Sequence, residues 1–357
     1  MARSAVVVLG AGASHDCAPE PALYNERSCP PLVKGLFDTE FFPILDKYPL
    51  ARAASTEARN VIKRGESIED YLRSLKEAPT ELRQQRYWQI PLYLQHLLWQ
   101  VGQMDGAGFT KDPGNVQTLV NELLELDDVL ILTLNYDTFV ESCIQVCGWV
   151  FASLDDYAKR GSSFSLVKLH GSVNWAFEVV PYGGPHFSSG TPGVGQILPF
   201  LDSARQNAGG WTTDDIVFRP NPDLDSMRYE DGRLFYPALS APLGVRDELT
   251  CPTQHVEVAK ARLAEMNDIN LLVIGYSGND VEVMDILRDR DRVLRQLAVV
   301  DVEPEYCEAV ERLITPLYRG VQGMPERASS GFTEFVASGR MAKFFGTSDS
   351  AGRGLAA

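Results

Sequence analysis

The sequence predicts an α/β fold in which a parallel β-sheet carries helices on both faces. Short apolar runs of strand length recur along the chain, at residues 5–9, 129–134, 164–169, 270–274 and 296–300. Continuous apolar runs are typical of parallel strands that are buried on both faces. Each run also ends in glycine or polar residues. The carboxyl ends of parallel strands are where open α/β sheets bind their ligands, so these residues are the candidates for a site.

The first run leads into a glycine turn, Gly10-Ala11-Gly12-Ala13-Ser14. The main-chain amides at the start of a helix suit a phosphate, and glycine without a Cβ lets a diphosphate approach the backbone. The dinucleotide fingerprint needs a third glycine, and His15 stands in that place, so the ordinary dehydrogenase motif is absent. A plain tight turn is the alternative interpretation.

Two segments without sheet character separate the strands. Residues 40–112 are expected to form an all-helical insertion, with Ser67 as the N-cap of one helix and an apolar face on another that carries Leu92, Leu94, Leu97, Leu98 and Val101. Residues 178–235 are rich in Gly, Pro, Ser and Asp and predict an irregular insertion with short strands near 216–218 and 234–236. A last helix is expected over 333–345. We therefore expect one domain, 1–345, followed by a flexible tail, 346–357.

Composition excludes several classes of function. The chain has 357 residues, 45% of them hydrophobic, and a formal net charge of -15. That charge argues against a broad nucleic-acid surface, which needs clustered Lys and Arg. No apolar run approaches the length of a membrane span, which predicts a cytoplasmic protein without a membrane partner. The six cysteines include no Cys-x-x-Cys pair, and His15, His96, His186 and His255 have no convergent partners, so no metal site is expected.

The polar strand ends occur in an order that resembles a known family. Thr133-Leu134-Asn135-Tyr136-Asp137 ends the second run, Lys168-Leu169-His170-Gly171-Ser172 ends the third, and Gly275-Tyr276-Ser277 with Asp280 ends the fourth. Together with the glycine turn and a Pro30-Pro31-Leu32 stretch followed by Leu36-Phe37, they resemble the sirtuin-like domain of prokaryotes. The resemblance implies a Rossmann-like fold. It also implies an NAD+ hydrolase of anti-phage defence, which depletes NAD+ in an infected cell.

Two departures separate the chain from deacylase sirtuins. Those enzymes carry a four-cysteine zinc module, which no cysteine spacing here could supply. They also follow the glycine turn with Pro-Asp-Phe-Arg, whereas this chain has Cys17-Ala18-Pro19-Glu20. Both differences put acyl-lysine chemistry in doubt and leave the nucleotide pocket in place.

Asn135 and His170 are the predicted catalytic residues. Cleavage of the bond between nicotinamide and ribose develops oxocarbenium character, and it needs a positioned water and charge stabilisation. An asparagine amide both donates and accepts, which suits the orientation of that water or of a ribose hydroxyl. A histidine accepts a proton near neutral pH. The alternatives are a helix N-cap for Asn135 and a structural role for His170.

The remaining predicted site residues bind the nucleotide. Gly10, Ala11, Gly12 and Ser14 would hold the diphosphate, and the resemblance implies the same for Gly275 and Ser277. Asp137 either caps the following helix or contacts the nicotinamide side. Asp301, at the end of the fifth run, either takes the hydroxyls of the adenosine ribose or forms a solvated turn.

The sequence thus predicts hydrolysis of NAD+ to nicotinamide and ADP-ribose, with NAD as substrate and no metal. Unrestrained loss of NAD+ would kill the host, so the resting enzyme is expected to be gated. The resemblance implies a homo-oligomer or a partner such as a HerA-like ATPase as the sensor. The alternatives are a non-catalytic module that binds NAD or ADP-ribose and a structural subunit of a defence complex.

Overall fold

The computed structural model describes residues 3–17, 29–102, 114–179, 212–222, 234–240 and 250–347. The chain divides into two compact units. The first comprises Met1–Pro30, Gly102–Leu169 and Thr253–Ala357, and the second comprises Pro31–Val101 and His170–Pro252. Each unit is described by itself below.

The first unit is built on a six-stranded sheet whose neighbouring strands are all parallel. Its order is β11-β9-β7-β1-β2-β3, which is the 3-2-1-4-5-6 order of a doubly wound Rossmann-like sheet when the strands are numbered along the chain. The strands are β1 (Ser4–Leu9), β2 (Asp128–Thr133), β3 (Phe164–Lys168), β7 (Ile269–Ile274), β9 (Gln296–Val300) and β11 (Glu326–Ala328). The predicted α/β fold class is confirmed.

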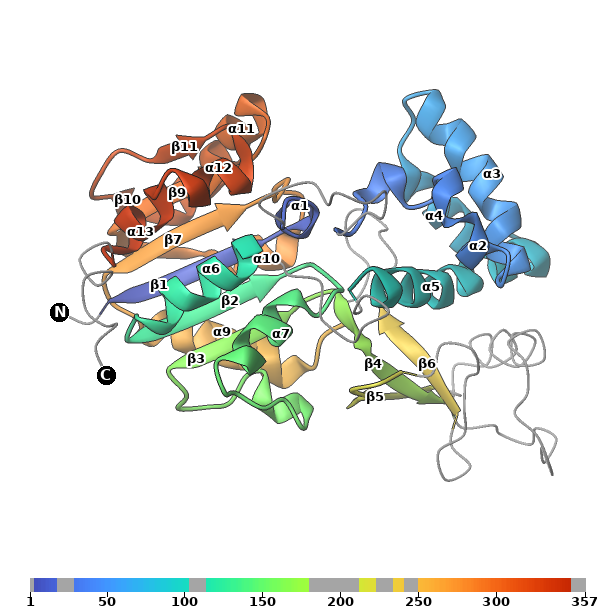
Figure 1. Cartoon of the computed structure of the whole chain (residues 1–357), viewed down its shortest axis with the longest axis horizontal. Coiled ribbons are helices and arrows are strands. Elements are labelled where there is room, and N and C mark those ends of the chain that lie inside the picture. The colour runs from blue at the N-terminus through green and yellow to red at the C-terminus, as the bar shows by residue number, and fades with distance from the viewer. Residues whose placement is uncertain are drawn as a thin grey trace. The chain divides into compact units, whose positions relative to one another are not determined.

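Helices cover both faces of this sheet (Figure 1). On one face α6 (Gly114–Leu124) contacts α7 (Phe139–Val146), α12 (Gly331–Ala337) and α13 (Arg340–Phe345). On the other face α9 (Thr253–Glu265) contacts α10 (Val281–Leu287), β2 and β3. The unit also holds α1 (Ala11–His15), the 3-10 turns η3 (Leu154–Asp156) and η4 (Thr315–Leu317), α11 (Pro304–Ile314), and a parallel pair of strands, β8 (Asp289–Leu294) and β10 (Tyr318–Val321).

The five apolar runs form strands whose bounds lie within one residue of the prediction. In β1 the side chains of Val6, Val7 and Val8 have no exposed surface, and Val6 lies in register with Leu130 on one side and Leu271 on the other. Burial on both faces explains why the runs are continuously apolar rather than alternating.

Three features of the C-terminal part differ from the prediction. The short strand β11 was not expected, because its first two residues are charged and at least partly exposed, and Ala328 by itself makes no apolar run. Strands β8 and β10 were not expected either, since charged residues dominate β8. The single helix expected over 333–345 is wrong: Gly339, at φ +70°, separates α12 from α13.

The second unit combines helices with a small antiparallel sheet. Its helices are α2 (Phe42–Leu45), α3 (Pro49–Lys63), α4 (Ile68–Lys76) and most of α5 (Glu81–Gly102), with 3-10 turns η1 (Val33–Gly35) and η2 (Thr39–Phe41). Ser67 caps α4 as predicted, because its Oγ accepts a hydrogen bond from the Asp70 amide at 3.1 Å. The predicted apolar face of α5 is buried.

The sheet of the second unit has the order β5-β4-β6, from β4 (Gly171–Val179), β5 (Thr212–Phe218) and β6 (Leu234–Leu239). Strands β5 and β6 include the two short strands that the sequence indicated. Strand β4 was not expected, because its Gly171-Ser172 start was interpreted as the polar end of the preceding strand. Most of the predicted irregular stretch, and His186 within it, lies outside the described residues.

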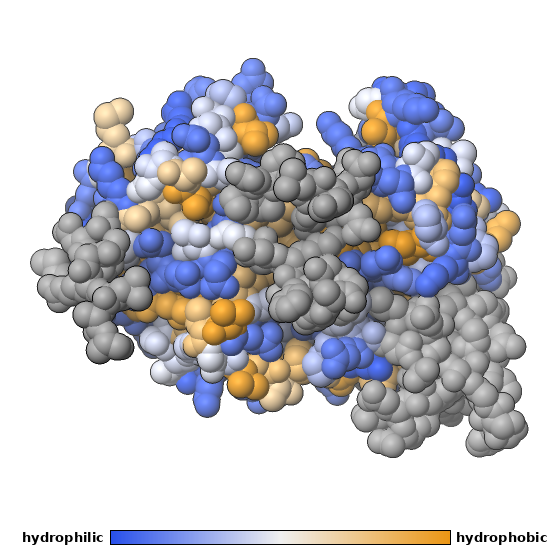
Figure 2. All heavy atoms as spheres, in the orientation of Figure 1, coloured by the Kyte–Doolittle hydropathy of each residue, from blue (hydrophilic) through white to orange (hydrophobic). Residues whose placement is uncertain are grey.

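Hydrophobic residues on the face shown in Figure 2 form small clusters between hydrophilic ones. No helix among the described residues is long and apolar enough to cross a membrane. At the start of the predicted tail, Thr347 is buried and donates a hydrogen bond to Ala342 O at 3.1 Å, and residues 348–357 lie outside the described part.

Candidate functional site

The turns that follow β1 and β7 contact each other through their backbones. These two strands are neighbours at the centre of the sheet, where the strand order reverses and where doubly wound sheets bind ligands. A Cβ on Gly10 would lie 2.2 Å from Gly275 O, and one on Gly12 would lie 2.7 Å from Gly275 Cα. Gly275 itself adopts φ +58°, and its Cβ would lie 2.4 Å from Gly12 Cα. Close packing therefore requires glycine at all three positions.

The amides of these glycines are engaged within the protein. Gly10 N donates to Ile274 O at 3.0 Å, Gly12 N donates to Gly275 O at 3.1 Å, and Gly275 N donates to Val300 O at 2.9 Å. The Gly-x-Gly pattern thus has a structural explanation that needs no phosphate. Diphosphate binding at this turn stays a prediction, and a ligand there would use other atoms than these three amides.

Asn135 joins the end of β2 to the glycine turn. Its Nδ2 donates to Gly10 O at 2.9 Å and to Ser14 Oγ at 2.8 Å, and its own amide donates to Thr133 Oγ1 at 3.1 Å. A carbonyl oxygen only accepts, so the atom facing Gly10 O is Nδ2 rather than Oδ1. The structure thereby brings three predicted site residues together: Asn135, Gly10 and Ser14.

Two atoms of this cluster keep hydrogen-bonding capacity. Asn135 Oδ1 has no hydrogen-bond partner among the described residues, and the Ser14 hydroxyl, which accepts from Asn135, still has its own proton to donate. Both side chains are buried, at 8% and 6% exposure, so their positions are fixed by packing. The pair can accept from a ribose hydroxyl or a water and donate to a ligand oxygen.

Asp137 makes the helix-capping contact that was one of its two expected roles. Its Oδ1 accepts from Phe139 N, the first amide of α7, at 3.1 Å. A helix N-cap was the alternative role for Asn135. The side chain that accepts the first amide of α7 is that of Asp137 and not that of Asn135. Contact of Asp137 with a nicotinamide stays a prediction.

His170 begins the second of the two chain segments that form the second unit, His170–Pro252. Its carbonyl accepts from Ser240 N at 3.0 Å, and the next residue, Gly171, has φ +86° and would place a Cβ 1.9 Å from Ala238 O. The glycine after the histidine is therefore required by packing between β4 and β6. The side chain of His170 is partly exposed, and its catalytic role stays a prediction.

The other predicted binding residues take part in local turns. Ser277 is exposed, and its Oγ accepts from Asn279 Nδ2 at 3.3 Å. Asp301 Oδ1 accepts from Glu303 N at 3.2 Å, which is the geometry of the turn alternative. Ala11 is exposed in the first turn of α1. Nucleotide binding by these residues stays a prediction.

Sequence reasoning missed a buried ion pair beside Asn135. Lys168, the last residue of β3, is 1% exposed, and its Nζ lies 2.8 Å from Glu141 Oε1 on α7. Burial raises the pKa of Glu141 above its ordinary value, and the neighbouring lysine opposes that shift. A lysine in a buried strand without any other charged residue was the available signal.

A second missed network ties α1 to distant helices. Asp16 Oδ2 accepts from Phe332 N at 2.7 Å and Thr333 N at 3.0 Å, so its carboxylate caps α12. Asn115 Nδ2 donates to Asp16 O at 2.9 Å. No local pattern could have revealed these contacts, because the partners are far apart in the sequence.

Among the described residues, no group of three or more His, Cys, Asp or Glu side chains is placed to hold a metal ion. None of the described cysteines forms a disulfide bond.

Comparison with known proteins gives distant structural likenesses only. No protein-family model matches the sequence, and no curated protein matches it. The chain is similar to a Sir2 homologue mutant in complex with 2'-O-acetyl-ADP-ribose, at a TM-score of 0.42 and 12% identity over 99% of this chain and 96% of that one. It is also similar to a Sir2 enzyme from a structural study of mechanism and regulation, at a TM-score of 0.40 and 10% identity over 97% of this chain and 93% of that one. With TM-scores below 0.5, these likenesses carry no argument about activity.

Proposed function

We propose that this protein hydrolyses NAD+ to nicotinamide and ADP-ribose. The observation that carries the proposal is the position of Asn135. It lies at the carboxyl edge of the sheet, beside the reversal of strand order, and it directs an unengaged acceptor away from two fixed hydrogen bonds. The order of the other motifs, which resembles that of prokaryotic sirtuin-like domains, supports the same ligand.

Asn135 orients the attacking water or a ribose hydroxyl through Oδ1. Because both protons of its Nδ2 are used inside the protein, the side chain acts as an acceptor and not as a donor toward the ligand. An acceptor held by two hydrogen bonds costs little reorganisation when charge develops on the ribose. Ser14 supplies a hydroxyl donor beside it.

His170 acts as the general base on the water or on a ribose hydroxyl. Nicotinamide is already a good leaving group in NAD+, so proton abstraction and positioning are the tasks left to the protein. Asp137, Gly275, Ser277 and Asp301 bind the remaining parts of the nucleotide in this proposal, with NAD as substrate and no metal.

In the cell, the protein acts as the NAD-depleting effector of a bacterial anti-phage defence system. Its activity is held off at rest and released by self-assembly or by a sensor subunit such as a HerA-like ATPase. The basis is the resemblance of the motifs and the toxicity of uncontrolled NAD+ loss. We place the protein in the cytoplasm for the same reason.

The test is nicotinamide release from NAD+ by the purified chain, measured beside Asn135→Ala and His170→Ala. Asn267→Ala, a change at an exposed asparagine outside the site, is the matched control. We expect release by the wild type and the control and a loss of at least about 100-fold in both site variants, the range typical of removing one catalytic group. Release that survives both substitutions would place the chemistry elsewhere.

If the isolated chain releases no nicotinamide, a second test is needed, because a gated enzyme would also be inactive when isolated. Intracellular NAD+ is then measured in bacteria that express the wild type or Asn135→Ala during phage infection. A fall in NAD+ with the wild type alone supports the gated hydrolase. Calorimetric NAD+ binding without any fall would favour the binding module, and failure to bind would favour the structural subunit.

A further inference from the structure

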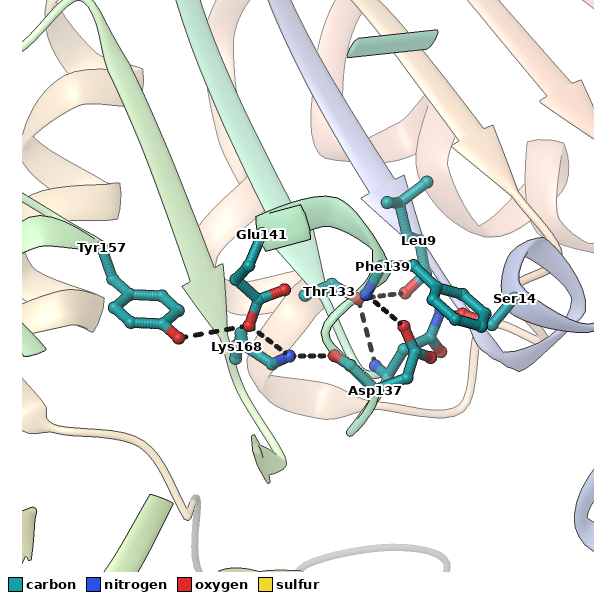
Figure 3. A network of polar contacts seen from close by, with 9 residues as sticks. Leu9, Ser14, Thr133, Asp137, Phe139, Glu141, Tyr157 and Lys168 are labelled. Atoms are coloured by element: carbon teal, nitrogen blue, oxygen red, sulfur yellow. Dashed lines mark hydrogen bonds and ion pairs between the residues drawn. The ribbon is translucent and has the colours of Figure 1, made fainter. Parts of the chain in front are cut away.

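A buried lysine holds the loop that carries Asn135. Lys168 Nζ donates to the backbone carbonyl of Asp137 and forms an ion pair with Glu141 Oε1 at 2.8 Å (Figure 3). Tyr157 adds a hydrogen bond from its hydroxyl to the same Glu141 oxygen at 3.3 Å. The loop between β2 and α7 is thus attached to the end of β3 two residues beyond Asn135.

The loop is fixed at three points. At its start, the Asn135 amide donates to Thr133 Oγ1, and the Asn135 side chain is bonded to the glycine turn. At its end, Asp137 Oδ1 accepts the first amide of α7. The contact from Lys168 is made to the backbone carbonyl of the same Asp137 and comes from the neighbouring strand. Removing it would free this carbonyl while leaving the contacts of Asn135 and of the Asp137 side chain in place.

Stability alone does not explain this ion pair. Taking two charges out of water is costly, and apolar residues of similar volume are often as stable or more so. Glu141 Oε2 is buried without a hydrogen-bond partner among the described residues, so the pair is not fully compensated. The strand positions before Lys168, Leu166 and Val167, are apolar and buried. A charged side chain here needs a reason other than packing.

A second buried cation contacts β2 and β3 near the opposite ends of these strands. Arg262, on α9, donates to Ser165 Oγ at 2.5 Å and pairs with Asp128 at the start of β2. Arg262 is 6% exposed, so it is buried to a similar extent as Lys168. Its contacts lie far along the strands from the Asn135 loop, which makes it an internal control for effects of a buried charge on stability.

We propose that Lys168 is a positioning residue, which fixes the loop 134–138 so that Asn135 presents Oδ1 to the ligand. Glu141 neutralises the lysine and holds its ammonium group on the Asp137 carbonyl. The role of this pair in turnover rests on the proposed hydrolysis of NAD+. Its role in ordering the loop does not.

The kinetic test compares Lys168→Met with Arg262→Met. We expect Lys168→Met to lower kcat by about 10-fold to 100-fold, as loss of positioning does, with KM changed less. Arg262→Met is expected to lower the urea midpoint and to leave kcat within about twofold. Lys168→Arg, which keeps a donor toward Asp137 O, is expected to restore most of the lost kcat. Equal kcat in Lys168→Met and the wild type would overturn the proposal.

A double variant separates the loss of loop positioning from a general loss of stability. Lys168→Met with Glu141→Leu removes both charges, so it should fold at least as stably as the single variant. The proposal requires its kcat to stay low although its stability is restored. If kcat returned with stability, the pair would be structural and the proposal would fail.

Hydrogen exchange separates this proposal from the proposed function, because it needs no turnover. Lys168→Met is expected to raise the exchange rates of amides 135–138 by at least about 10-fold relative to Arg262→Met, since local opening governs exchange in a loop. Unchanged rates would refute the positioning role whatever the activity. Raised rates in a chain whose wild type neither hydrolyses nor binds NAD+ would leave the positioning intact and refute the hydrolase.

Discussion

Gly275→Ala is the substitution that tests how tightly the two central turns are packed. The new Cβ would lie 2.4 Å from Ala13 N and from Gly12 Cα, and 2.5 Å from Gly12 C. All three are backbone atoms, so no side chain can rotate away to make room. The residue would also have to keep φ +58°, which L-residues rarely adopt.

The size of the effect follows from these two terms. The left-handed conformation costs about 1–2 kcal/mol for an L-residue. Overpacking of a close-packed contact adds about 1–3 kcal/mol, since backbone must shift. We therefore expect Gly275→Ala to lower the free energy of unfolding by about 2–5 kcal/mol. Gly161→Ala is the matched control, because Gly161 has φ +77° but no heavy atom within 4 Å of its Cβ position. It should lose only the conformational term of about 1–2 kcal/mol.

Urea denaturation followed by circular dichroism measures both variants against the wild type. Equal losses for the two alanines would refute the reasoning, since they would mean that the turns separate at no cost. A loss at Gly275 that exceeds the loss at Gly161 by about 1 kcal/mol or more supports it. The comparison needs no assumption about a ligand.

Two further predictions follow from perturbed ionisation. Cys147 is exposed, whereas burial raises the pKa of Cys251 to about 12, so a disulfide reagent at pH 8 should modify Cys147 first, and Cys147→Ser should remove the fast phase of the reaction. Burial raises the pKa of Glu141 above 4.5, so its contribution to stability is fully present below that pH and is lost as pH rises through its folded pKa. The free energy of unfolding of the wild type should therefore fall relative to that of Glu141→Gln as pH rises from 4, by at most about 1.4 kcal/mol per pH unit. Urea denaturation at several pH values measures this, and a wild type that gains stability relative to Glu141→Gln as pH rises would contradict the raised pKa.

The sequence contained enough information to predict the central sheet. Five apolar runs were long enough to be strands buried on both faces, and all five are neighbours in one parallel sheet. Strand β11 was missed because only one of its three residues, Ala328, is apolar and buried. Strand β4 was missed because it begins at Gly171, inside the polar motif that was interpreted as the end of β3.

The proximity of two candidate site residues follows from their places in the sequence, but their contacts do not. Asn135 comes directly after the second apolar run and Ser14 belongs to the glycine turn after the first, and the structure places Asn135 Nδ2 2.8 Å from Ser14 Oγ. What the sequence could not reveal is which atoms are already used. The Nδ2 of Asn135 and the amides of Gly10 and Gly12 are satisfied by partners more than 100 residues away in the sequence, and those pairings exist only in three dimensions.

These internal hydrogen bonds narrow what the site can do. An asparagine with a free amide could serve as donor or acceptor, but Gly10 O and Ser14 Oγ take both protons of Asn135 and leave the acceptor. The glycine turn is likewise fixed against β7 and offers fewer amides to a diphosphate than its spacing indicated. The hydrogen bonds that use these donors also hold Asn135 Oδ1 in one place. Lys168 supports the same loop through its hydrogen bond to the Asp137 carbonyl. A site of this kind is suited to orienting a hydroxyl or a water at one point, which is the task that cleavage of a bond to a good leaving group requires.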